Sequence, residues 1–175
     1  KTLASKDPYG LTADEAGIFN LYSMPTDFYR KLNESLSYED RERAKPFFPC
    51  LKLMLDASRK LPKAKGTVWR GVKKSLRGQF EKGQEVIWWR VTSTTKEIDT
   101  LNNPDFLGRE GERTLFMIEM KNGIDISIYS VYRDSEAEVV LLPGSCLKVV
   151  ASQDFGNGLV IVHLEEVDSE VTLFR

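Results

Sequence analysis

The fold is decided at residues 61–72, which read LPKAKGTVWRGV. Pro62 ends the helical pattern that precedes it, because proline lacks the backbone N–H that a helix interior needs. From Thr67 onward the chain consists of short runs rich in valine, isoleucine and aromatic residues, which are typical of strands. Helices first and strands later predict one α+β domain, with a helical lobe over about residues 10–62 and a β core over about residues 66–175.

Three helices are expected before this boundary. Thr12 and Glu15 fit a capping box, in which a hydroxyl and a carboxylate each accept a hydrogen bond from the other residue's backbone N–H. Met24-Pro25 ends the first helix. Apolar side chains recur at helical spacing in each helix. The first helix has Ile18, Leu21 and Tyr22, and the second has Phe28, Leu32 and Leu36. The third has Leu51, Met54, Leu55 and Leu61, and it begins after Pro46 and Pro49.

A series of strands is expected after the boundary. Asn122-Gly123 lies between two of them and suits the positive backbone dihedrals of a tight hairpin turn, so part of the sheet should be antiparallel. The stretch Thr95–Glu112 is interpreted as a short helix or an ordered loop. The expected strands are Thr67–Val72, Val86–Thr92, Thr114–Met120, Ile124–Tyr129, Glu138–Leu142, Cys146–Ala151, Gly158–Glu166 and Glu170–Phe174.

Composition narrows the class of protein. With 175 residues, 41% of them apolar and 29% charged, the chain suits one soluble globular domain. A formal net charge of -1 predicts no overall attraction to nucleic acid, and no apolar run is long enough to span a bilayer. We expect a monomer. Residues 1–9 carry no charged-then-apolar signal pattern, so no compartment is predicted.

Cysteine and histidine are scarce. Cys50 and Cys146 are too few for a disulfide framework and lack zinc-site spacing, although one bridge between them stays open. His163 is the only histidine, which excludes a multi-histidine metal centre. It lies in the apolar run Leu159–Leu164 and is interpreted as a strand residue without a chemical role.

Two features of the β core could bind a polar ligand. In Trp69-Arg70-Gly71, the arginine has a fork of donors that matches phosphate, and the glycine admits close approach to the backbone. The alternative is an arginine on a solvated strand face. The row Thr92-Ser93-Thr94-Thr95 could hold a ligand or orient a carboxylate, or could instead cap a helix or fill a turn.

A third feature is the pair of carboxylates in Glu136-Ala137-Glu138, directly before the apolar run Val139–Leu142. Residues two apart on a strand share a face, so these carboxylates would point the same way and repel each other when both are ionised. The alternative is an exposed pair of glutamates before a strand.

In this order the three features resemble the R-S-E class of ADP-ribosyltransferases, in its arginine-specific branch. The match comprises WRG at 69–71, VTSTT at 91–95 and YRDSEAEVVLLP at 132–143. Tyr22, YRKLN at 29–33 and IYS at 128–130 are also similar to that branch, so the resemblance covers nearly the whole chain. The chain departs from the family at Val91, Thr95 and Gly144, where phenylalanine, serine and proline are frequent. The class with a His-Tyr-Glu set is disfavoured, because Arg70 stands where its histidine would be.

The resemblance implies a fold and an activity. The fold is an N-terminal helical lobe packed on a largely antiparallel split β-sheet or β-sandwich core. The activity is that of an NAD–protein-arginine ADP-ribosyltransferase, with NAD as co-substrate, an arginine-bearing protein as acceptor, nicotinamide as product and no metal. An NAD glycohydrolase and a catalytically silent NAD-binding module of the same fold are the alternatives.

The resemblance also implies roles for the donor site. Glu138 would stabilise the positive charge that builds on the ribose as nicotinamide leaves, and Ser93 would orient Glu138. Arg70 would hold the diphosphate and the adjoining ribose. Gly71, through its backbone, and Thr94 are assigned to NAD binding as well.

The acceptor side involves fewer residues. An incoming guanidinium stays protonated at ordinary pH, so Glu136 is expected to pair with it and to help remove its proton. Tyr132 is expected to contact the acceptor. Phe106 could cover the nicotinamide ring or be a core residue.

Overall fold

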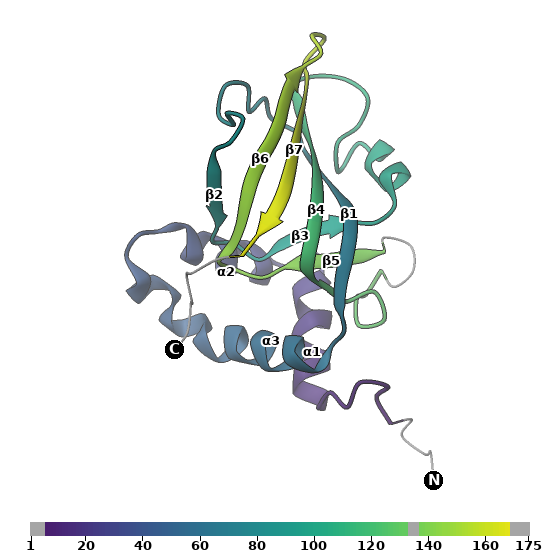
Figure 1. Ribbon diagram of the computed structural model, residues 1–175. Coiled ribbons are helices and arrows are strands. Elements are labelled where there is room, and N and C mark those ends of the chain that lie inside the picture. Colours follow the sequence, from purple (N-terminus) through teal and green to yellow (C-terminus); the bar gives the residue numbers. More distant parts are fainter. Residues whose placement is uncertain (1–5, 133–136, 169–175) are drawn as a thin grey trace.

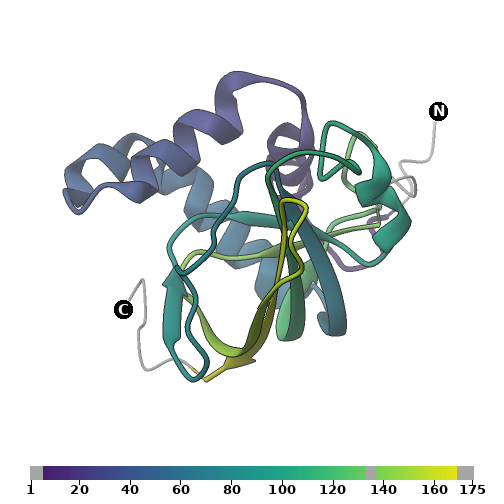
Figure 2. The same ribbon diagram turned by 90° about the horizontal axis from the view of Figure 1, so that it is seen from above.

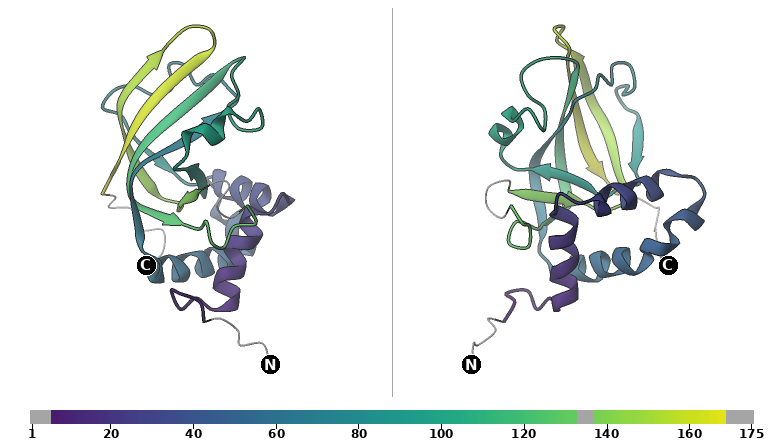
Figure 3. Two further views of the ribbon diagram at one scale, coloured as in Figure 1. Left: turned by 90° about the vertical axis from the view of Figure 1, so that its right-hand side faces the viewer. Right: turned by 180° about the vertical axis from the view of Figure 1, so that it is seen from behind.

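The computed structural model describes residues 6–132 and 137–168 of the chain. Helices come first and strands follow, so the α+β prediction is confirmed. The three α-helices lie together at one end of the strands in Figure 1 and in both views of Figure 3. The helices are α1 (Ala13–Ser23), α2 (Asp27–Ser37), the 3-10 helix η1 (Arg41–Phe47), α3 (Phe48–Lys60) and the 3-10 helix η2 (Ile98–Asn102).

The strands form one strongly curved sheet, seen from above in Figure 2. Its order is β1-β3-β5-β4-β7-β6-β2, and an additional pairing of β1 with β4 closes the first four of these strands into a ring. Only the β4–β7 pairing within the described sheet is parallel, which confirms a largely antiparallel core. The strands are β1 (Lys63–Val72), β2 (Glu85–Trp88), β3 (Thr92–Thr95), β4 (Arg113–Asp125), β5 (Glu138–Leu141), β6 (Ser145–Asp154) and β7 (Leu159–Val167).

Helix α1 begins with the expected capping box. Thr12 Oγ1 accepts from the Glu15 N–H at 3.2 Å, and the Glu15 carboxylate accepts from the Thr12 N–H at 2.8 Å. Lys60 on α3 donates to the same carboxylate at 2.7 Å. Glu15 therefore both caps α1 and ties its first turn to the end of α3.

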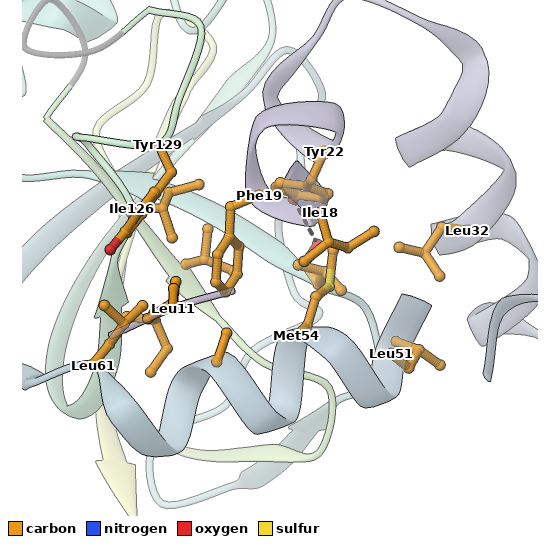
Figure 4. Packing of buried hydrophobic residues seen from close by; sticks show 14 of the residues in the cluster. Leu11, Ile18, Phe19, Tyr22, Leu32, Leu51, Met54, Leu61, Ile126 and Tyr129 are labelled. Carbon is orange, nitrogen blue, oxygen red and sulfur yellow. Dashed lines mark hydrogen bonds between the residues drawn. The ribbon is translucent and has the colours of Figure 1, made fainter. Parts of the chain in front are cut away.

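Two apolar cores meet at strand β5. One core lies between the helices and the sheet, and Figure 4 shows Phe19, Met54 and Ile126 packed in it. The other lies inside the curved sheet and includes Phe116 and Leu147. Neighbouring residues of β5 point to opposite faces. Accordingly, Val140 belongs to the helical core and Val139 to the sheet core.

The predicted hairpin turn at Asn122-Gly123 is wrong, because β4 runs through both residues. The Glu166 carboxylate on β7 accepts from the Asn122 N–H at 2.9 Å and from the Asn122 side-chain amide at 3.1 Å. Gly123 is required by packing, since a Cβ there would lie 2.9 Å from a methyl carbon of Val139. A contact between segments more than forty residues apart thus replaces the turn.

Two other strand predictions are corrected. The expected strand Val86–Thr92 is two strands, since β2 pairs with β6 at one edge while β3 pairs with β1 and β5. The hydroxyl row is therefore itself a strand. The expected strand Ile124–Tyr129 ends at Asp125, after which the N–H groups of Tyr129 and Ser130 both bond to the carbonyl of Ile126 in a turn. The expected strand 170–174 lies outside the described residues.

The two cysteines and the single histidine lie at positions that the structure describes. Cys50 and Cys146 are both free thiols, so no bridge joins them. His163 lies on β7 as predicted, and its Nε2 is buried without a hydrogen-bond partner among the described residues. Within the described ranges, no helix is long and apolar enough to cross a membrane.

Candidate active site

Arg70 lies on β1 and reaches across to β3. Its Nη1 donates to the carbonyl oxygen of Ser93 at 2.8 Å. Burial lowers the pKa of Arg70, the hydroxyl of Tyr22 raises it, and the charge of Arg90 lowers it. An arginine remains protonated even so. The site therefore holds a half-buried positive charge, whose attraction for an anion is stronger than it would be in open water.

Ser93 connects the arginine to a carboxylate. On the neighbouring strand β5, Glu138 lies opposite Thr95, so Ser93 is its diagonal neighbour on the same face. Ser93 Oγ donates to Glu138 Oε1 at 2.8 Å. The Tyr22 hydroxyl lies 2.9 Å from Ser93 Oγ and 3.3 Å from the Val91 carbonyl oxygen. Because the serine proton is given to Glu138, the one Tyr22 proton is shared between these two acceptors. A chain of two hydrogen bonds thus runs from α1 to the carboxylate.

The ionisation of Glu138 reflects opposing effects. Burial raises its pKa, and the hydroxyls of Ser93 and Ser130 lower it. The residue is only 6% exposed. Burial also raises the pKa of Tyr22 to about 12, so this hydroxyl keeps its proton and stays a donor at neutral pH. The carboxylate is consequently held in one orientation by groups that favour its charged form.

The helical lobe fixes the start of β3. The side-chain amide of Asn33 on α2 donates to the Val91 carbonyl at 3.0 Å, and its oxygen accepts from the Val91 N–H at 2.9 Å. Both backbone groups of one residue are satisfied by one side chain. This pairing ties the start of β3 to α2, and so fixes the position of Ser93, two residues later, relative to the helices.

These groups face a cleft formed by two adjoining hollows. Arg70, Ser93, Phe106 and Glu138 line both. The first hollow is completed by Trp69, Gly71, Thr94, Thr95, Thr100 and Leu101, and the second by Tyr22, Ser23, Met24, Pro25, Tyr29, Asn33, Val91 and Tyr132. The first hollow therefore lies between the sheet and the segment that contains η2 and Phe106, and the second lies between the sheet and helices α1 and α2.

The other predicted site residues have varied positions. Thr94 lines the first hollow, but its hydroxyl donates to the Val139 carbonyl at 2.7 Å. Tyr132 is 41% exposed at the rim of the second hollow. Phe106 borders both hollows. Glu136 lies outside the described residues.

Sequence reasoning missed three contacts. Gly71 must be glycine because a Cβ there would lie 2.6 Å from the Cβ of Leu107. Ser130 acts on Glu138, and Asn33 holds Val91. Ser130 and Asn33 belong to the motifs at 128–130 and 29–33 that match the family, but nothing in the sequence indicates that they contact Glu138 and Val91.

The chain belongs to the NAD:arginine ADP-ribosyltransferase family, whose model matches residues 1–172. It is therefore an ADP-ribosyltransferase that uses NAD as co-substrate. Comparison with curated protein sequences gave no match.

Solved structures share the fold. The Vis toxin from Vibrio splendidus is 22% identical, with 95% of this chain and 79% of that chain covered and a TM-score of 0.74. HopU1 of Pseudomonas syringae pv. tomato is 22% identical over 87% and 76% of the two chains, with a TM-score of 0.72. The Clostridium limosum C3 exoenzyme is 14% identical over 91% and 88%, with a TM-score of 0.67.

Proposed function

We propose that this enzyme transfers ADP-ribose from NAD to arginine side chains of a target protein and releases nicotinamide. The observation that carries the proposal is the buried Glu138 carboxylate, held by Ser93 in the cleft that also contains Arg70. The description of the matching family supports arginine as the acceptor.

The residues of the cleft suit the donor half of the reaction. As the bond between ribose and the nicotinamide nitrogen breaks, its electron pair leaves with nicotinamide and positive charge develops on the sugar. A fixed, ionised Glu138 stabilises that charge more than it stabilises neutral ribose, which lowers the barrier. Ser93 and Tyr22 keep the carboxylate in place before the reaction begins.

The remaining donor-side residues bind NAD. Arg70 offers its planar fork to the diphosphate, and its half-buried surroundings strengthen this contact. Gly71 presents its backbone to the nicotinamide amide, Thr94 lines the same hollow, and Phe106 covers the nicotinamide ring. The two hollows together offer NAD the polar side chains of Arg70, Ser93 and Glu138 and the aromatic side chain of Phe106.

The acceptor half needs a second carboxylate. A guanidinium nitrogen forms the new bond to the ribose carbon and must lose a proton as it does so. We assign removal of that proton to Glu136, on the basis of its sequence position two residues before Glu138. Tyr132, at the rim, contacts the acceptor.

Two glutamine variants test this division of labour. Glu138→Gln should abolish nicotinamide release with or without an acceptor, because it removes the charge that stabilises the ribosyl cation. Glu136→Gln should lose transfer to agmatine yet keep hydrolysis of NAD, since water needs no guanidinium partner. Nicotinamide release and labelled-agmatine formation are measured side by side.

Glu165→Gln, at an exposed position on β7, is the control and should match the wild type in both assays. If Glu136→Gln transfers to agmatine normally, or loses both activities together, the assignment of Glu136 and the arginine proposal lose their support. An active Glu138→Gln protein would remove Glu138 from the chemistry.

A further inference from the structure

The segment from Ile126 to Tyr132 follows β4 and leads to the rim of the cleft. Its side chains are poorly buried toward the end, with Ile128 53%, Val131 39% and Tyr132 41% exposed. Apolar burial of these three side chains therefore contributes little to fixing the segment. Backbone hydrogen bonds must supply much of the constraint.

Helix α1 provides two of those bonds, in addition to the turn bonds to the Ile126 carbonyl and the bond from the Tyr132 N–H to Ser130 Oγ. The side-chain amide of Asn20 donates to the Tyr129 carbonyl at 3.0 Å, and the Val131 N–H donates to Ser23 Oγ at 2.9 Å. Ser23 in turn donates to the Asn20 carbonyl at 2.8 Å, which fixes its rotamer. The ring of Tyr129 also packs against the tilted ring of Phe19, with ring centroids 6.3 Å apart.

Tyr22, which lies between Asn20 and Ser23 on α1, faces the cleft and supports the donor side of the site. Tyr22 bonds to Ser93 Oγ, and through it supports Glu138. The last turn of α1 thus reaches the donor side through the hydroxyl of Tyr22. It reaches the segment 129–131 through the side-chain amide of Asn20 and the hydroxyl of Ser23. The two sets of bonds share no atom and can be removed separately, although Ser130 of the segment also bonds to Glu138 and links the two halves at one residue.

We propose that Asn20 and Ser23 are positioning residues for the acceptor. They fix the backbone of residues 129–131 and so place Tyr132 at the rim of the second hollow, where the arginine side chain enters. This inference rests on the proposed function, in which Tyr132 contacts the acceptor. Asn20 and Ser23 act through this backbone segment and bond to Tyr129 and Val131 rather than to Glu138.

Ser23→Ala leaves the Val131 N–H without its partner and tests the proposal. The KM for agmatine should rise roughly 5- to 20-fold, the range expected when one hydrogen bond that orders a binding segment is lost. Nicotinamide release to water should fall less than transfer to agmatine does, and this smaller loss is expected because Ser130 of the same segment also bonds to Glu138. Ser23→Thr keeps the hydroxyl and should restore the KM for agmatine. Asn20→Ala, which removes the neighbouring bond, should shift it in the same direction.

Ser35→Ala is the matched control, because Ser35 is also a buried helical serine but its hydroxyl bonds within α2, to the Leu32 carbonyl at 2.6 Å. It should leave the KM for agmatine unchanged. If the wild type modifies agmatine and both Ser23→Ala and Asn20→Ala match it, this inference is wrong and the proposed function stands. Equal loss of hydrolysis and transfer in these variants, with an unchanged KM for agmatine, also overturns it. A wild type that releases nicotinamide but never modifies agmatine overturns both proposals.

Discussion

At the scale of single residues, the site depends on how much charge Glu138 carries. Burial raises its pKa, and the donated hydrogen bond from Ser93 is the largest effect that lowers it. The sequence predicted that Arg70, Ser93 and Glu138 would act together, and the structure brings all three to one cleft. It could not predict that Tyr22 would complete the hydrogen-bond chain, because that contact joins residues 71 positions apart.

Removing the Ser93 hydroxyl should therefore change both rate and pH dependence. Ser93→Ala is expected to lower the kcat of nicotinamide release by roughly ten- to a thousand-fold, as when one preorganising contact is lost. Because the lost bond favoured the charged carboxylate, the pKa of Glu138 rises, and the acidic limb of the kcat profile should move to higher pH.

The measurement is nicotinamide release across a pH series, with Thr92→Ala as the control. Thr92 Oγ1 contacts the Arg90 carbonyl at 3.3 Å and does not reach Glu138. An unshifted acidic limb in Ser93→Ala, at wild-type kcat, would leave Ser93 as an ordinary strand residue.

At the scale of elements, the predictions that succeeded rest on local signals. The capping box at Thr12, the apolar stripe on α2 and the alternation on β7 all describe neighbours along the chain. The predictions that failed rest on contacts between distant segments. Glu166 straightens β4 through Asn122, and Asn33 separates β3 from β2 by holding Val91. Neither contact has a signature in the sequence around the residue that it controls.

Helix α1 allows a test of how much a local signal stabilises the site. Thr12→Ala removes the hydroxyl of the capping box and should lower the free energy of unfolding by about 1 kcal/mol. Thr26→Ala at the start of α2 should cost less, because the Thr26 hydroxyl accepts at a longer distance of 3.4 Å and lacks the reciprocal glutamate contact. Urea denaturation followed by circular dichroism measures both changes.

The comparison of the two losses of unfolding free energy tests the role of the capping box. Equal losses would mean that the reciprocal Glu15 contact adds nothing to the cap. A loss in Thr12→Ala well beyond about 2 kcal/mol would instead point to an effect on the packing of α1 against α3, since a cap alone rarely contributes more.

At the scale of the whole molecule, β5 belongs to both cores. Val140 packs with the helices and Val139 packs inside the sheet, while Glu138 begins the same strand. A strand cannot keep one face ordered when the other loses its packing, because both faces share one backbone. The cleft that holds Glu138 is thus formed where the two cores meet, and the helical lobe and the β core should unfold as one unit.

Val140→Ala tests this coupling. It removes two buried carbon atoms from the helical core and should lower the free energy of unfolding by about 2 kcal/mol. Tryptophan fluorescence in a Trp89→Phe background reports on the β part, because Trp69 and Trp88 lie on β1 and β2 whereas the Trp89 ring contacts Arg41 of the helical lobe. Circular dichroism at helical wavelengths reports on the lobe. In urea the two transitions should coincide in the wild type and shift together in the variant. Val131→Ala, at a side chain that is 39% exposed, should shift neither by much. If the helical signal of Val140→Ala is lost at a lower urea concentration than the fluorescence signal, the lobe unfolds independently and β5 does not couple the two cores.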